Sequence, residues 1–143
     1  MNTKAMDINK LLVEFYERFS AWEHHIVEGS GLPLPMMHTL ELLGLYGPMR
    51  MTDLAEKLCI STGTLTVRVD KLASDGLVDR IANPQDRRSL LISLTKHGHQ
   101  LFKEHDLAHL EMTQTLTGDL SADDKATLQR LLGLLTEKFD TLT

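Results

Sequence analysis

The 143-residue sequence predicts a mainly α-helical fold that contains one small β-hairpin. Two observations support this fold class. Both ends of the chain, residues 7–28 and 95–142, carry apolar residues at the three- and four-residue spacing of amphipathic helices. Between them, residues 77–81 and 90–94 are rich in β-forming residues, and a short polar turn separates these two runs.

The first helix is expected over residues 7–28, after a loose tail of residues 1–6. Two glycines and two prolines within residues 29–35 end this helix. A second helix is predicted over residues 36–46, just before a Gly-Pro pair. The apolar residues of the first helix share one stripe: Ile8, Leu12, Phe15, Phe19, Trp22 and Ile26.

The middle of the chain predicts two helices joined by a tight turn, over residues 52–58 and 62–74. Ser61 precedes the second of them, and its side-chain oxygen can accept a hydrogen bond from a free amide of the first turn. Gly76 suits a left-handed stop after that helix. The buried face of the same helix is expected to comprise Leu65, Val69 and Leu72.

The hairpin follows directly. Its strands are predicted over residues 77–81 and 90–94, and the turn between them contains Asn83, Pro84 and Asp86. A helix, a tight turn, a second helix and a hairpin make up the winged helix-turn-helix arrangement, in which the hairpin is the wing.

Two further helices are expected after the hairpin. Thr95 is placed to cap a long helix that reaches about Leu116. Ser121 and Asp124 form a capping box at the start of a last helix. The apolar stripe of the last helix comprises Leu128, Leu131, Leu135, Phe139 and Leu142.

The composition, with 42% hydrophobic and 24% charged residues, is that of an ordinary globular protein. The sequence has no apolar run of membrane-spanning length, no signal-peptide pattern and a single cysteine, so a cytoplasmic protein is expected. The net charge is −5, but residues 49–100 contain eight Lys and Arg against six Asp and Glu, a balance of +2. This basic excess lies where contact with nucleic acid is expected.

Several short motifs carry a family resemblance: Leu54-Ala55, Leu58, Ser61, Val69-Asp70-Lys71-Leu72, Gly76-Leu77-Val78, Arg80, Asp86-Arg87-Arg88, Leu94-Thr95 and Gly98. Together they resemble the MarR family of bacterial transcription regulators, over nearly the whole chain. In one respect the sequence departs from the family, whose wing usually opens with an acidic residue and a further arginine. Asn83 and Gln85 stand there, which softens the phosphate contacts expected at the shoulder of the wing.

The resemblance implies one domain over residues 1–143, with a DNA-binding winged helix-turn-helix lobe over about 36–98. It implies that about residues 7–28 and 95–142 form a helical dimerisation bundle, and that residues 49–51 add a short strand beside the wing. The expected protein is a homodimeric repressor. Its paired recognition helices would read a palindromic operator in double-stranded DNA. The protein would also respond to a small effector.

The helix over residues 62–74 is the expected recognition helix. Hydroxyl groups on it can bond phosphates or base edges, and Val67 can contact a thymine methyl group. Arg88 matches the wing-tip arginine that enters the minor groove in the family, and Arg87 is expected at phosphate. The predicted DNA-contacting residues are Ser61, Thr62, Gly63, Thr64, Val67, Arg68, Lys71, Arg87 and Arg88. Arg68 has a second interpretation, in which it pairs with Asp86 and holds the wing in position.

Histidines suggest a metal site. His105 and His109 lie four residues apart on one predicted helix, which is a common half of such a site. The chain resembles a zinc-sensing branch of the MarR family, in which His38 and His24 match further ligand positions. The predicted zinc ligands are therefore His24, His38, His105 and His109.

Alternatives to this metal site remain open. Trp22 defines the apolar stripe of the first helix, and His24 lies roughly opposite it, so His25, Glu23 or Glu28 could replace His24 as a ligand. The other hypothesis for the effector is a small organic anion, bound between the DNA-binding lobe and the dimerisation helices without a metal.

An enzyme is not expected, and no catalytic residues are predicted. A metal-dependent hydrolase built on the histidines would be the enzyme alternative, but the sequence lacks a His-Glu-x-x-His helix and a nucleophile elbow. An interaction module that has lost DNA binding is disfavoured because Asp86 and Arg88 are intact. Cys59, in the turn of the helix-turn-helix, is interpreted as a structural thiol.

Overall fold

The computed structural model describes residues 3–142, with side chains from residue 7 onward. It is mostly helical and contains one small three-stranded antiparallel sheet, as the sequence predicts. The chain divides into two compact units, residues up to 107 and residues from 108 onward, and one long helix runs through the boundary.

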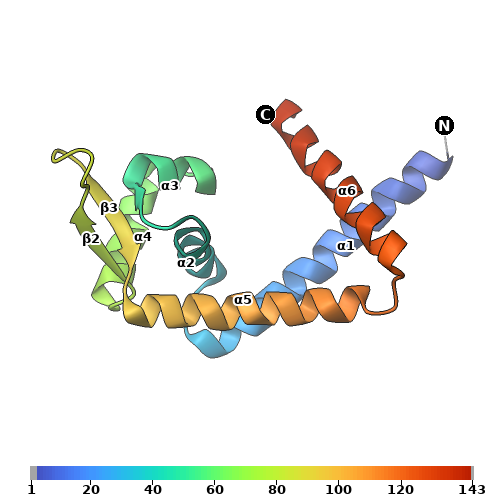
Figure 1. The fold of residues 1–143 in the computed structure, drawn as a ribbon, viewed down its shortest axis with the longest axis horizontal. Coiled ribbons are helices and arrows are strands. Elements are labelled where there is room, and N and C mark those ends of the chain that lie inside the picture. The colour runs from blue at the N-terminus through green and yellow to red at the C-terminus, as the bar shows by residue number, and fades with distance from the viewer. Residues whose placement is uncertain (1–2, 143) are drawn as a thin grey trace. The chain divides into compact units, whose positions relative to one another are not determined.

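The first unit contains the helix-turn-helix and the sheet, which lies beside α3 and α4 (Figure 1). Its elements are α1 (Thr3–Val27), the 3-10 turn η1 (Glu28–Ser30), α2 (Leu34–Tyr46), β1 (Met49–Arg50), α3 (Met51–Leu58), α4 (Thr62–Ser74), β2 (Val78–Ala82), β3 (Leu90–Leu94) and the start of α5 (Lys96–Thr117). The second unit comprises the end of α5, α6 (Ala122–Lys138) and the 3-10 turn η2 (Phe139–Thr141).

Three helix boundaries differ from the prediction by two or more residues. The last helix, predicted to reach Leu142, ends at Lys138 and continues as the 3-10 turn η2, and the other two differences are at helix starts. Helix α1 already begins at Thr3, so residues 3–6 are helical rather than a loose tail, and residues 1–2 lie outside the described part. No glycine or proline in residues 3–6 interrupts the helix. Helix α2 begins at Leu34 because Pro35 falls in its first turn, where the missing N–H of proline costs no helical hydrogen bond.

The sheet has the order β1-β3-β2 and forms the predicted wing. Strands β2 and β3 pair antiparallel from Val78 opposite Leu94 to Ala82 opposite Leu90. The two-residue strand β1 adds to the other edge of β3, where Met49 pairs with Ile92. The sheet therefore ties the start of α3 to the hairpin.

The core of the first unit lies between α2, α3, α4 and the sheet. The apolar face predicted for α4 is buried as expected, since Leu65, Val69 and Leu72 are fully inaccessible to solvent. Other fully buried side chains come from every neighbouring element: Leu40, Leu54, Val78 and Ile92. This packing fixes which face of α4 remains exposed.

A compact junction connects the end of α4 to the start of α5. The Thr95 hydroxyl donates a hydrogen bond to the Gly76 carbonyl at 2.6 Å and accepts one from the Gly98 amide at 3.0 Å. The Thr95 amide also donates to the Leu77 carbonyl at 3.1 Å. Gly98 packs so tightly here that a β-carbon on it would lie 2.0 Å from the Leu77 carbonyl oxygen. The motif Leu94-Thr95-x-x-Gly98 thus has a direct structural explanation.

Apolar residues predicted as packing stripes are partly exposed in the single chain. On α1, Ile8 is 60% exposed and Phe15 is 56% exposed, whereas Val27 at the far end of the helix is buried. The stripe of α6 continues into η2, and along it Leu135 is 49% exposed and Phe139 is 65% exposed. A lone chain leaves these surfaces in water.

No helix within residues 3–142 is both long enough and apolar enough to span a lipid bilayer.

Substitution of Gly98 by alanine tests the junction. The new methyl group would overlap the Leu77 carbonyl, so we expect Gly98→Ala to lower the free energy of unfolding by about 2–3 kcal/mol. Gly133→Ala is the matched control, because a β-carbon at Gly133 in α6 meets nothing within 4 Å. That change should raise helix stability by about 0.5–1 kcal/mol. Equal denaturant unfolding curves for Gly98→Ala and the wild type would contradict the proposed close contact.

Candidate functional site

Helix α4 is held at its start by Ser61. The Ser61 hydroxyl oxygen accepts a hydrogen bond from the Thr64 amide at 3.1 Å, which is the predicted helix cap, and its hydroxyl lies 3.0 Å from Thr64 Oγ1. Cys59, an exposed residue in the turn before it, adopts a left-handed conformation with φ of 56°. Cap and turn together set the direction in which α4 leaves α3.

The predicted contact residues of α4 lie on its solvent side. Val67 is 71% exposed, which is unusual for a branched apolar side chain on a packed helix. Lys71 is held by Asp75 at 3.2 Å, and Arg68 is half-buried. The exposed members of the predicted set are Ser61, Thr62, Gly63, Thr64, Val67 and Lys71. The buried apolar face of α4 leaves this surface available.

The wing loop has a defined internal structure. The Asp86 carboxylate accepts a hydrogen bond from the Arg88 amide at 3.0 Å, which is an Asx turn. The side-chain oxygen of Asn83 accepts from the Gln85 amide at 3.0 Å, and the Asn83 amide group donates to the Ser89 hydroxyl at 2.9 Å. These bonds shape the loop, and the side chains of Arg87 and Arg88 extend into solvent.

An ion pair links the wing to α4, and no role in this link was predicted for its two residues from the sequence. Arg80 on β2 donates a hydrogen bond to Asp70 on α4 at 2.5 Å. By contrast, Arg68 forms no hydrogen bond or ion pair with Asp86 among the side chains described from residue 7 to 142. Both Asp70 and Arg80 belong to the family motifs, so the motif contained the signal although residue spacing alone did not.

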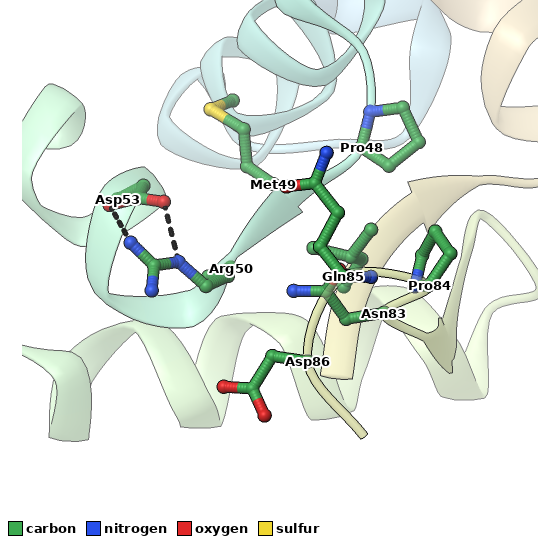
Figure 2. A pocket seen from close by; sticks show the side chains of 9 residues that line it. Pro48, Met49, Arg50, Asp53, Asn83, Pro84, Gln85 and Asp86 are labelled. Atoms are coloured by element: carbon green, nitrogen blue, oxygen red, sulfur yellow. Dashed lines mark hydrogen bonds and ion pairs between the residues drawn. The ribbon is translucent and has the colours of Figure 1, made fainter. Parts of the chain in front are cut away.

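A second polar group lies at the base of the wing (Figure 2). Arg50 donates two hydrogen bonds to Asp53, from Nε at 3.0 Å and from Nη2 at 3.3 Å. Asp53 raises the pKa of the Arg50 guanidinium, and the more distant Asp86 carboxylate also raises it. The pair borders a hollow of about 590 Å³ whose other side is formed by the wing loop, including Asn83 and Gln85.

Two histidine–carboxylate pairs connect α2 to α1 and to α5. His38 on α2 hydrogen-bonds Glu23 on α1 at 2.8 Å. His105 on α5 forms an ion pair with Glu41 on α2, and the His105 side chain is only 3% exposed. One potential ligand atom each of Glu23, Glu41 and His105 lies within 4.8 Å of the others. Since α5 is continuous, His109 projects from the same face one turn further on.

Two of the predicted ligands lie outside this group of donor atoms, namely His38, which hydrogen-bonds Glu23, and His24. His24 is exposed, and its Nδ1 donates to the Ser20 carbonyl at 2.8 Å within α1. Glu23, one of the alternatives to His24, is the α1 residue near His105. Sequence reasoning missed Glu41. A signal for it existed, because Glu41 is the single charged residue of α2 and follows His38 by three residues, almost one turn.

Close packing places Glu41 and His105 beside each other. One turn along each helix, a β-carbon on Gly44 would lie 2.4 Å from the ring of Phe102. Only a glycine at this position allows α2 to approach α5 so closely. The buried ring of Phe102 therefore determines the position of α5 relative to α2 at the histidine–carboxylate pair.

Comparison with known proteins identifies the family. Residues 32–90 match the model of the MarR family. The multiple antibiotic resistance protein MarR of Escherichia coli is 38% identical over 81 residues, which cover 56% of this chain and 56% of that protein. The HTH-type transcriptional regulator YxaD of Bacillus subtilis is 30% identical over 100 residues, 70% of each chain. The chain belongs to the MarR family.

The three-dimensional comparison agrees. The MarR winged helix-turn-helix fold is shared with a crystal structure of a mutant of Escherichia coli MarR complexed with operator DNA, at a TM-score of 0.69 and 26% identity. That alignment covers 92% of this chain and 95% of the crystallised one. The MarR family consists of transcription regulators rather than enzymes, in agreement with the sequence prediction.

The Ser61 cap can be tested by stability alone. Removal of its hydroxyl in Ser61→Ala leaves the Thr64 amide without its acceptor, so we expect a loss of about 1 kcal/mol in the free energy of unfolding. Ser61→Asn, which keeps an acceptor at the same position, should stay within a few tenths of a kcal/mol of the wild type. Chemical denaturation checks both, and unchanged stability of Ser61→Ala would show that the cap is unimportant.

Proposed function

We propose that this MarR-family chain is a DNA-binding transcription regulator that acts in the cytoplasm as a homodimeric repressor at a palindromic operator. The observation that carries the proposal is the exposed surface of α4 beside the wing arginines. Hydroxyl groups, a projecting Val67 and a lysine lie on one helix face, and Arg87 and Arg88 lie at the wing tip. This combination suits a helix in the major groove and an arginine in the adjacent minor groove.

The homodimer is supported by the exposed apolar stripes. Those of α1 and α6 contain leucines and phenylalanines that are about half exposed in the single chain. Burial of such residues against a second copy would remove a large apolar surface from water. Two recognition helices would then meet the two halves of a palindrome about one turn of DNA apart.

We further propose that the effector is a divalent metal ion, with zinc preferred. Glu23, Glu41 and His105 supply oxygen and nitrogen donors, and His109 on the next turn of α5 is the proposed fourth ligand. Tetrahedral zinc places its ligand atoms about 3.4 Å apart, so donors already within 4.8 Å need only small side-chain movements. His38, bound to Glu23, would orient that carboxylate from outside the metal shell.

A metal ion bound at the proposed site could change the affinity of the protein for DNA through the packing of its helices. The proposed ligands come from α1, α2 and α5, and α2 packs in the same core as α3 and α4. An ion that binds one arrangement of these helices more tightly than another shifts the equilibrium between them, typically with an effect of about 5–150-fold on the affinity for the second ligand.

The DNA-binding proposal predicts a specific effect of Arg88. A palindromic duplex would first be selected by the wild-type protein from a pool of randomised sequences. Arg88→Ala should weaken binding to that duplex about 10–100-fold, since a minor-groove arginine contact is lost. The melting temperature of the protein should stay unchanged, because Arg88 lies on an exposed loop. The control is Arg18→Ala on α1, which removes an exposed arginine of the same charge. An unchanged affinity of Arg88→Ala would mean that the wing tip does not contact DNA.

The metal proposal predicts which residues retain zinc. Elemental analysis of untagged protein should find about one zinc ion per chain, and Glu41→Gln and His105→Ala/His109→Ala should lose it. His24→Ala/His25→Ala removes the same number of histidines from an exposed part of α1 and should keep the metal. A chelator should change the affinity of the wild type for its selected duplex. Absence of metal, or metal without effect on DNA binding, would instead favour a small organic anion as the effector.

A further inference from the structure

Arg50 occupies a fixed position between the helix-turn-helix and the wing. Strand β1 pairs Arg50 with Leu91, the second residue of β3, so its backbone is part of the sheet. Its guanidinium is held by both carboxylate oxygens of Asp53 in the first turn of α3. A planar guanidinium bound by two parallel contacts has a defined orientation although it lies at the surface.

The hollow beside Arg50 separates it from the wing loop (Figure 2). Arg50 and Asp53 border one side, and Asn83, Gln85 and Asp86 border the other. Residues 83–86 include no positively charged side chain, and Asp86 is the one carboxylate among them. Among the residues that line the hollow, Arg50 carries the one positive charge, and Asp86 lines the same hollow.

Asp86 is also coupled to the wing tip. Its carboxylate accepts a hydrogen bond from the Arg88 amide, so a movement of Asp86 carries the backbone of Arg88 with it. The Asp86 carboxylate repels the phosphates that approach Arg87 and Arg88, and the positive charge of Arg50 would reduce this repulsion. The electrostatic attraction between Asp86 and Arg50 also contributes to the raised pKa of Arg50.

We propose that Arg50 is a positioning residue for the wing: anchored by Asp53, it attracts Asp86 and so sets where Arg88 stands, while it offsets the repulsion between Asp86 and DNA. This assigns to Arg50 the wing-positioning role that one of the two interpretations of the sequence gave to Arg68. The inference rests on the proposed DNA-binding function and adds to it a residue outside α4 and the wing loop.

A double-mutant cycle tests the coupling between Arg50 and Asp86. Affinities for the selected duplex would be measured for Arg50→Ala, Asp86→Asn and the double variant. Asp86→Asn removes the charge but keeps an oxygen that can accept from the Arg88 amide. Arg50→Ala should weaken binding about two- to fivefold, the range of an exposed charge pair, and the same change should have little further effect in the Asp86→Asn background. Arg50→Lys, which keeps the charge, should recover part of the loss.

The salt dependence of binding separates positioning from direct contact. If Arg50 touched a phosphate itself, Arg50→Ala would reduce the slope of log affinity against log salt by about 0.9. We expect the slope of Arg50→Ala to equal that of the wild type. The matched control is Arg18→Ala, which breaks an exposed arginine–carboxylate pair on α1 and should leave DNA affinity unchanged.

Two results would overturn the role of Arg50: losses that multiply in the double variant, or a slope reduced by one phosphate contact. Failure of the wild-type protein to select any duplex is a different result, which would contradict the proposed function itself. The two failures are therefore distinguishable.

Discussion

The close contact of Gly98 with the Leu77 carbonyl, and the hydrogen bonds of Thr95 around it, hold the winged helix-turn-helix together. At this point the end of α4, the beginning of β2, the end of β3 and the first turn of α5 all meet. A side chain at residue 98 would separate these elements. The direction in which the wing leaves α4, and that in which α5 leaves the wing, both depend on this junction.

The predicted DNA-binding side chains share one property: each lies on a helix or loop whose position is held by packing or hydrogen bonds inside the protein. Helix α4 is fixed by its buried face and by the Ser61 cap. The wing loop is fixed by the bonds of Asn83 and Asp86 to neighbouring amides. Preorganisation of this kind reduces the entropy that binding would otherwise cost. The surface can therefore be polar and exposed while its geometry remains defined.

Much of this arrangement could be predicted from the sequence. The bounds of α4 and its buried face follow from local signals, namely an N-cap residue, a helical apolar repeat and a glycine stop. The strands were predictable because turn formers separate two β-rich runs. Local signals of this type act over a few residues and depend little on distant parts of the chain.

Contacts between distant segments could not be predicted in the same way. Glu41 and His105 are far apart in sequence, and their meeting depends on the glycine that lets α2 approach α5. The expectation for His24 was based on a family position, whereas the rotation of α1 places Glu23 toward α2 instead. One interpretation of the sequence paired Arg68 with Asp86 and gave no role to Arg50, whose place beside the wing loop depends on the pairing of β1 with the distant strand β3.

The ion pair between Arg80 and Asp70 has a consequence for how operators are distinguished. Because it joins β2 to α4, and β1 joins the same sheet to α3, we expect the proposed recognition helix and the wing to move together. In the proposed homodimer, an effector would then leave the preferred bases of each half-site unchanged and alter the number of base pairs tolerated between them. The base sequence of the half-sites and the number of base pairs between them could accordingly change independently when such a regulator acquires a new operator.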